Sequence, residues 1–283
     1  MKKLKSKPPF TLKSITLDGA RGPIAALSGG PLRAVQSPVF FVHGEGGLAP
    51  DDPFLLMLAQ NHRVIAPILP GFAGGERGAP IEDVRDMLDF TLFGLEALEA
   101  SGLRDPIVMG HSMGGMVAAE MAAVAPQSVT RLTLISALGL WLDEHPIADL
   151  FAAMPFELPA LLFHDQAESA ERMARAGVIG GGFDPGANDP NAFVEHMVRN
   201  ARNLGAAGKL MFPIPDRGLK QRLYRIRART SVIWGDNDRV TPSIYGEAFA
   251  SSIAAARLIV VPEAGHMAHW EQPEAVLRAA AFA

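Results

Sequence analysis

Short apolar runs alternate with longer helical segments along most of this 283-residue chain. Residues 38–42 and 63–66 are dominated by apolar side chains, which is typical of strands covered on both faces of a sheet. Residues 81–100 repeat apolar side chains at three- and four-residue steps, which predicts a helix. The alternation predicts an α/β fold with a mostly parallel central sheet and helices on both faces. The expected strands are residues 11–17, 23–27, 38–42, 63–66, 106–109, 131–135, 231–234 and 257–261, the first two of which could form an antiparallel hairpin.

The alternation stops between residues 140 and 229, a segment that we call the insert. It contains helical runs but no convincing strand, so we expect a helical lid over the carboxyl edge of the sheet. The remaining residues, 11–139 and 230–283, then form the α/β core, and residues 1–10 form a short disordered basic tail. The expected helices of the insert are residues 147–164, 167–176 and 191–205, with a glycine-rich loop at 177–190.

Composition excludes several classes of function. The net charge of −4 argues against a nucleic-acid-binding protein, and no run reaches the ~18 apolar residues of a membrane span. The absence of cysteine excludes disulfides, thiolate metal sites and a cysteine nucleophile. The first ten residues carry four lysines without a following apolar region, so we expect no secretory signal and a cytoplasmic location. The oligomeric state is not determined by these features.

A G-x-S-x-G motif occupies residues 110–114, with Ser112 at its centre. It follows the expected strand at 106–109 and precedes a helix expected from Met113 to Val124. This strand–turn–helix setting is that of a nucleophile elbow, in which small residues allow a sharp turn that exposes the serine hydroxyl above the sheet. Ser112 is therefore the candidate nucleophile.

A serine hydroxyl needs an adjacent base, and that base needs an orienting carboxylate. His266 follows the expected strand at 257–261 and is a candidate base, with His269 as an alternative. The carboxylate candidates are Asp236 and Asp238, which follow the preceding strand, together with Asp143. A metal site is not expected, because His266 and His269 lack an H-E-x-x-H pattern or a third ligand.

Together these motifs resemble the α/β-hydrolase family, and the resemblance covers nearly all of the chain outside the insert. The matching residues are His43-Gly44, Pro70-Gly71-Phe72, the elbow, the W-G-x-x-D loop at 234–238 and the G-H-x-x-x-x-E-Q-P segment at 265–273. The resemblance implies Ser112 as nucleophile, His266 as general base and acid, and Asp238 as its orienting carboxylate. It also implies an oxyanion hole formed by the backbone amides of Met113 and Glu45, and no cofactor. Glu45 departs from the neutral residue usual at that position.

The insert is rich in apolar side chains, some of which should face the site and favour a small to medium apolar substrate. We therefore expect a serine hydrolase acting by acyl transfer through an acyl-enzyme on a small-molecule ester or lactone, most simply a carboxylesterase or lactonase. The alternative is a carbon–carbon bond hydrolase acting on a ring-cleavage-type dienoic acid. Trp270, four residues after His266, and the helical lid are similar to those of hydrolases of ring-cleavage products. A ligand-binding protein without turnover is a third hypothesis. Candidate pocket residues are His111, Trp141, Phe151, Met154, Phe163, His269 and Trp270.

Overall fold

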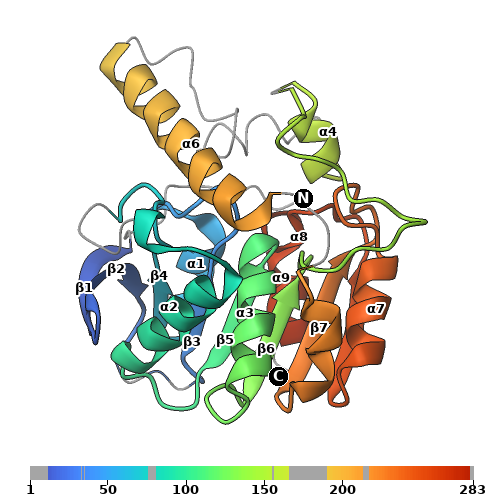
Figure 1. Cartoon of the computed structure of the whole chain (residues 1–283), viewed down its shortest axis with the longest axis horizontal. Helices are drawn as coiled ribbons and strands as arrows, with labels where there is room; N and C mark the ends of the chain where they lie inside the picture. The colour runs from blue at the N-terminus through green and yellow to red at the C-terminus, as the bar shows by residue number, and fades with distance from the viewer. Residues whose placement is uncertain are drawn as a thin grey trace.

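The computed structural model describes residues 12–32, 34, 36–75, 81–154, 156–165, 190–212 and 217–280. Its centre is an eight-stranded sheet in the order β1-β2-β4-β3-β5-β6-β7-β8 (Figure 1). The β1–β2 and β2–β4 pairs are antiparallel and all other neighbours are parallel, which confirms the mostly parallel sheet and the antiparallel first hairpin that the sequence predicts. The strands are β1 (Lys13–Gly19), β2 (Gly22–Gly29), β3 (Val39–Val42), β4 (Val64–Pro67), β5 (Ile107–His111), β6 (Arg131–Ile135), β7 (Arg229–Gly235) and β8 (Ala256–Val261).

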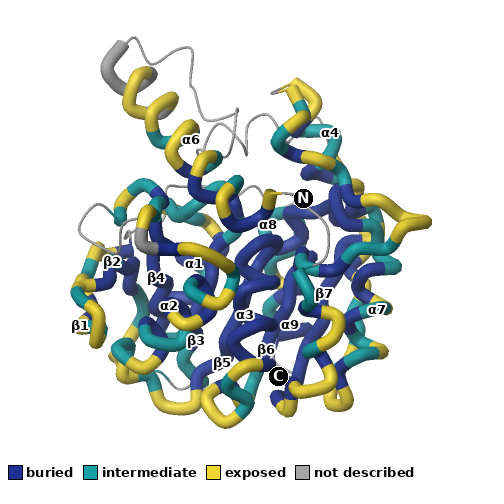
Figure 2. Tube along the Cα trace, in the orientation of Figure 1, coloured by how far each residue is buried: buried dark blue, intermediate teal, exposed yellow. Residues whose placement is uncertain are grey.

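Helices cover both faces of the sheet. Side chains alternate between the faces along each strand, so that Phe40 and Val42 of β3 join one apolar cluster while Val39 and Phe41 join another. The first cluster packs under α2 (Met87–Ala100), α3 (Met113–Val124) and α7 (Ile244–Ser252). The second packs under α1 (Pro53–Leu58), α8 (Ala268–Glu271) and α9 (Pro273–Ala280). Figure 2 shows the central strands and α3 as buried.

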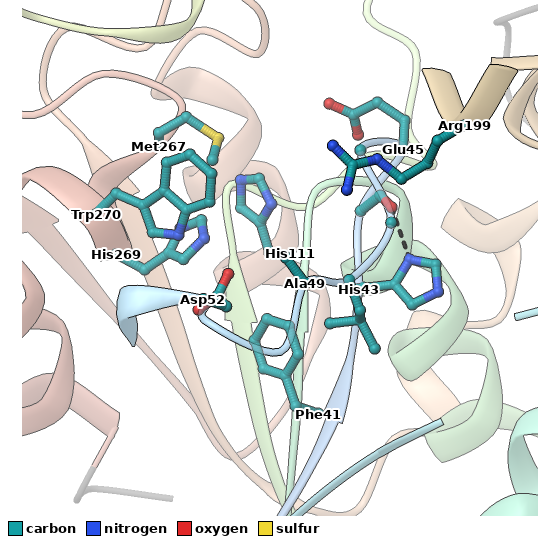
Figure 3. Close-up of a pocket in the computed structure, with 14 residues that line it drawn as sticks. Phe41, His43, Glu45, Ala49, Asp52, His111, Arg199, Met267, His269 and Trp270 are labelled. Atoms are coloured by element: carbon teal, nitrogen blue, oxygen red, sulfur yellow. Dashed lines mark hydrogen bonds between the residues drawn. The ribbon is translucent and has the colours of Figure 1, made fainter. Parts of the chain in front are cut away.

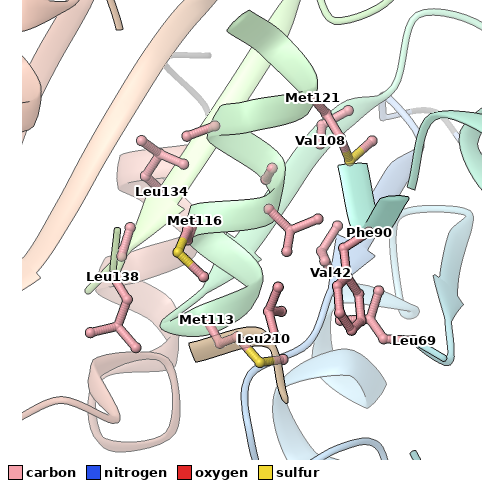
Figure 4. Close-up of a cluster of buried hydrophobic side chains, with 14 of the residues drawn as sticks. Val42, Leu69, Phe90, Val108, Met113, Met116, Met121, Leu134, Leu138 and Leu210 are labelled. Carbon is pink, nitrogen blue, oxygen red and sulfur yellow. The ribbon is translucent and has the colours of Figure 1, made fainter. Parts of the chain in front are cut away.

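Helix α3 lies at the centre of the first cluster (Figure 4), and all its residues from Met113 to Ala123 are buried, so that it has no exposed face over this length. A helix that is apolar on all sides is stable only when it is enclosed by other elements. Met113, Met116 and Met121 of α3 pack in this cluster with Leu210, which comes from the insert. The helix that follows Ser112 is therefore fixed from several directions.

The insert separates β6 from β7 and contains no strand among its described residues. Its described elements are α4 (Leu158–Leu162), α6 (Pro190–Met211) and the 3₁₀ turns η2 (Leu219–Gln221) and η3 (Leu223–Arg225). Figure 1 shows α4 and α6 beyond the carboxyl edge of the sheet. The inner end of α6 is buried at Ala207 and Leu210, whereas Val194 and Val198 near its outer end are exposed (Figure 2).

Two helices predicted from sequence are shorter in the structure. The helix expected at 81–100 is a 3₁₀ turn, η1 (Ile81–Asp83), followed by α2, because the Asp86 side chain caps the amide of Asp89 and sets the start of α2. Of the helix expected at 147–164, only α4 is helical, since Asp149 instead bonds the amides of Phe151 and Ala152 in a turn. The segments expected at 1–10, 167–176 and 177–189 lie outside the described residues.

Candidate active site

Ser112 occupies the sharp turn between β5 and α3. Its backbone has φ 52° and ψ −120°, a region that side-chain-bearing residues rarely adopt. A Cβ atom on Gly110 would lie 2.3 Å from the carbonyl oxygen of Gly114, and one on Gly114 would lie 2.2 Å from that of Val42. Both distances are sterically impossible, so this turn requires glycine on each side of the serine.

Ser112, His266 and Asp238 form one hydrogen-bonded chain. The Ser112 hydroxyl lies 2.9 Å from Nε2 of His266. The other ring nitrogen, Nδ1, lies 3.0 Å from Oδ2 and 3.2 Å from Oδ1 of Asp238. All three side chains are buried. The ends of β5, β7 and β8 bring them together at the carboxyl edge of the sheet, which is where parallel α/β folds place their ligands.

The carboxylate of Asp238 is held by its own loop. Oδ1 accepts the amide hydrogens of Val240 and Thr241 at 3.0 and 2.9 Å, and Oδ2 accepts the Thr241 hydroxyl at 2.9 Å. Burial alone would raise the pKa of Asp238, but the charge and hydrogen bond of His266 and the amide of Thr241 lower it below its ordinary value. Asp238 is therefore ionised when it faces the imidazole.

The imidazole of His266 has its pKa raised above the ordinary 6.5. Burial opposes this shift, but the charge and hydrogen bond of Asp238 outweigh it, and the charge of Glu45 adds to it. An imidazole with a raised pKa is a stronger base toward the Ser112 proton. It is also the group whose protonation sets the response of the site to pH.

The other carboxylate candidates have different partners. Oδ1 of Asp236 accepts the side-chain amide of Asn237 and the backbone amide of Ala264. Asp143 accepts the indole hydrogen of Trp141 at 2.9 Å. The structure thus brings Asp238, and neither of these two residues, to His266.

The loop at residues 43–47 passes directly beside Ser112. A Cβ atom on Gly44 would lie 3.5 Å from Cβ of Ser112 and 3.1 Å from Nδ1 of His111. His43 fixes this loop, because its Nδ1 donates to the carbonyl oxygen of Gly44 and its Nε2 accepts the amide hydrogen of Leu69. Burial lowers the pKa of His43 to about 4, so its ring stays neutral. The sequence indicated the His43-Gly44 motif but not this supporting role.

A cavity opens beside the 43–47 loop (Figure 3). Figure 3 places Glu45 and Arg199 on one side of His111, and Met267, His269 and Trp270 on the other. The residues that line it are Phe41, His43, Gly44, Glu45, Gly46, Gly47, Leu48, Ala49, Asp52, His111, Arg199, Met267, His269 and Trp270. The predicted pocket residues His111, His269 and Trp270 are therefore adjacent in space.

The imidazoles of this cavity are neutral. His111 donates from Nε2 to the carbonyl oxygen of His266 at 3.0 Å, and burial together with the charge of His266 lowers its pKa to about 3. Burial likewise lowers the pKa of His269 well below its ordinary value. The ring of His269 packs against those of His111 and Phe54, with centroids 4.2 and 5.3 Å apart. Among the described residues no cluster of three His, Cys, Asp or Glu side chains could hold a metal ion.

The other four predicted pocket residues lie apart from the described walls of this cavity. Phe163 is fully buried in the first apolar cluster, with its ring centroid 6.4 Å from that of Trp270. Phe151 packs edge-on against Phe212 of the insert, and Met154 is half exposed. Trp141 is bonded to Asp143. Their contact with a substrate remains a prediction.

Sequence reasoning missed Asp52 and Arg199 as cavity residues. Asp52 caps α1 by accepting the amide hydrogen of Leu55, and burial raises its pKa to about 6. Arg199 lies on α6, far along the chain from the other lining residues. The Asp-Pro pair that begins α1 is a recognisable cap signal, but no local pattern could place α6 beside the 43–47 loop.

The family model of the alpha/beta hydrolase fold matches residues 37–273. The chain belongs to this family of hydrolases. It is 30% identical over 258 residues to a 2-hydroxymuconate semialdehyde hydrolase of Pseudomonas sp. (strain CF600), covering 87% of this chain and 84% of that protein.

It is also 26% identical over 268 residues to Lipase 1 of Psychrobacter immobilis, covering 93% of this chain and 80% of that protein. A meta-cleavage product hydrolase structure from Pseudomonas fluorescens IP01 superposes with a TM-score of 0.69 at 18% identity, covering 95% of this chain and 96% of the other. In the part of the chain that the structure describes, no helix combines the length and apolar character needed to cross a membrane.

Proposed function

We propose that this protein is a serine hydrolase that acts by acyl transfer on a small, neutral ester or lactone. The observation that carries the proposal is the buried chain from Ser112 through His266 to Asp238, with contacts of 2.9 and 3.0 Å. Such a chain lets the imidazole remove the serine proton while the carboxylate stabilises the imidazolium that forms.

The reaction follows from these contacts. The oxygen of Ser112 attacks the substrate carbonyl as His266 takes its proton, giving a tetrahedral intermediate. The amides of Met113, at the start of α3, and Glu45, in the 43–47 loop, are proposed to donate to its oxyanion. His266 then protonates the leaving alcohol, and an acyl-enzyme remains. A water molecule that His266 deprotonates releases the acid and restores Ser112.

The test combines active-site labelling with turnover. A fluorophosphonate probe should label Ser112 stoichiometrically, and an activated aryl ester should show a burst of product equal to the labelled fraction, followed by steady turnover. Labelling without any turnover of esters or lactones would favour a ligand-binding protein. Absence of both would contradict the proposal.

A second candidate is hydrolysis of a carbon–carbon bond in a ring-cleavage-type dienoic acid. The name of the 2-hydroxymuconate semialdehyde hydrolase, 30% identical to this chain, favours it, as does the presence of Arg199 in the cavity, which could meet a substrate carboxylate. The name of Lipase 1 favours the ester. Turnover of a vinylogous dienoic acid, compared with a neutral aryl ester at equal concentration, separates the two candidates.

A further inference from the structure

The cavity beside the 43–47 loop adjoins the proposed reaction centre, although Ser112, His266 and Asp238 are not among its described lining residues. His111 immediately precedes Ser112, Met267 immediately follows His266, and both line the cavity. Gly44, which lines the cavity, lies close to Ser112, since a Cβ atom on Gly44 would lie 3.5 Å from Cβ of the serine. A substrate whose carbonyl meets Ser112 can therefore extend a neighbouring group into this space.

Two buried polar atoms of the cavity have no hydrogen-bond partner among the described residues. They are Oε2 of Glu45 and Nδ1 of His269, whose residues are only 5% and 3% exposed. Buried polar atoms normally have partners, because leaving one unpaired costs free energy. Both residues line the cavity, so a ligand group there could supply the missing partners.

The cavity offers hydrogen-bond acceptors from several side chains. Glu45 and Asp52 contribute carboxyl oxygens, of which an ionised carboxylate only accepts. The neutral ring of His111 donates through Nε2 to the backbone of His266, which leaves its Nδ1 as an acceptor beside Gly44. His43 uses both of its nitrogens within the protein. Arg199 is the cationic residue among the described lining residues, against two carboxyl groups.

We propose that this cavity is a substrate subsite that binds a hydroxyl group on one half of a neutral ester, with Glu45 and His269 as the residues that determine this specificity. The proposal rests on the proposed function. A hydroxyl can donate its one hydrogen to the carboxylate of Glu45, or it can bond to Nδ1 of His269, accepting from this nitrogen when it carries the ring hydrogen and donating to it when it does not. A substrate carboxylate would instead share the cavity with two carboxyl groups and, among the described lining residues, a single cationic residue, Arg199, which makes its binding less favourable than that of a neutral hydroxyl.

The experiment compares matched esters that differ at a single terminal group. One set of aryl esters carries an ω-hydroxyacyl, an alkanoyl or an ω-carboxyacyl chain of equal length, and a second set varies the alcohol half in the same way. In one of the two sets kcat/KM should be about tenfold higher for the hydroxyl than for the alkyl ester, since an unmet polar group costs about that factor. The carboxyl ester should be the poorest.

Variants assign the preference to residues. Glu45→Met should abolish the hydroxyl preference, whereas Glu45→Gln, which keeps an acceptor oxygen, should retain most of it and improve turnover of the carboxyl ester. His269→Phe should weaken the preference independently. Each readout is a ratio between two substrates on one preparation, so a partly unfolded sample does not change it.

The outcomes separate this proposal from the proposed function. Equal turnover of hydroxyl and alkyl esters in both sets would overturn the subsite and leave the hydrolase intact. A preference for the carboxyl ester would overturn it in favour of an anion site at Arg199. Should no ester be hydrolysed, calorimetric binding of the same esters to Ser112→Ala still decides the subsite, which requires the hydroxyl ester to bind about tenfold more tightly than the alkyl ester.

Discussion

Asn203 of α6 donates a hydrogen bond from Nδ2 to the carbonyl oxygen of Gly46, 2.8 Å away. Its Oδ1 accepts the amide hydrogen of Ala73 at 2.9 Å, and the side chain is buried. Gly47, at φ 78°, leaves room for this contact, because a Cβ atom there would lie 2.6 Å from Nδ2. One buried amide thus ties the insert to the 43–47 loop that carries a proposed oxyanion donor.

Replacement of Asn203 by leucine should disturb both attachments. It removes two hydrogen bonds and leaves the Gly46 carbonyl and the Ala73 amide unpaired, so we expect the free energy of unfolding to fall by about 1–3 kcal/mol. We also expect kcat and KM for a neutral ester to change together, as is usual when an element that positions a site moves. Gly205→Ala on the same helix is the control, because a Cβ there meets open space. Unchanged kinetics in Asn203→Leu would contradict the coupling.

Ser112→Ala and His266→Ala should each lower kcat for an activated ester by about 10³-fold or more. The two side chains act through one hydrogen bond of 2.9 Å, so the double variant should be little slower than either single variant. Stopped-flow and steady-state assays on purified, folded protein measure this. Near-normal turnover in Ser112→Ala would falsify the mechanism.

Asp238→Asn should keep the fold and lower kcat by about 10²–10⁴-fold, because the imidazole loses the acceptor that fixes its tautomer. Asp236→Asn is the matched control, two residues away in the same loop but bonded to Asn237 and Ala264 instead. It should cost much less. If the two effects were reversed, Asp238 would not be the orienting carboxylate.

Activity on a neutral ester should be lost as pH falls, because only the neutral imidazole of His266 accepts the serine proton. Since the pKa of His266 is raised, the midpoint in kcat/KM should lie above 6.5. Glu45 contributes to that shift, so Glu45→Gln should move the midpoint to lower pH. Asp52, whose pKa is about 6, provides the control: Asp52→Asn should leave a midpoint above 6.5. A midpoint at or below 6.5 in the unmodified protein would contradict this account.

The sequence predicted the parts of the fold and site that local patterns specify. The elbow at Ser112 and the loops bearing Asp238 and His266 each follow an apolar strand, and parallel strands end at one edge of a sheet. Their meeting therefore follows from connectivity. The presence of all eight strands was likewise predicted, although several begin or end a few residues from the expected positions.

The remainder depends on contacts that no local pattern encodes. Arg199 and Asn203 reach the 43–47 loop only because α6 packs back on the core through Ala207 and Leu210. Within the insert, Asp149 competes with helix formation by bonding nearby amides, which apolar periodicity does not reveal. Glu45 was recognisable as unusual, yet its burial could be seen only in three dimensions.

The backbone of Ser112, at φ 52°, sets activity against stability at a single residue. Holding a side chain in such a conformation costs about 1–3 kcal/mol, and glycine would be free of that strain while losing about 0.5–1 kcal/mol through the greater freedom of its unfolded chain. Ser112→Gly, which has no nucleophile, should therefore be at least as stable as the active protein. A selection for thermal stability alone would accept the loss of the reactive side chain, so any laboratory evolution of this protein must select for turnover at the same time.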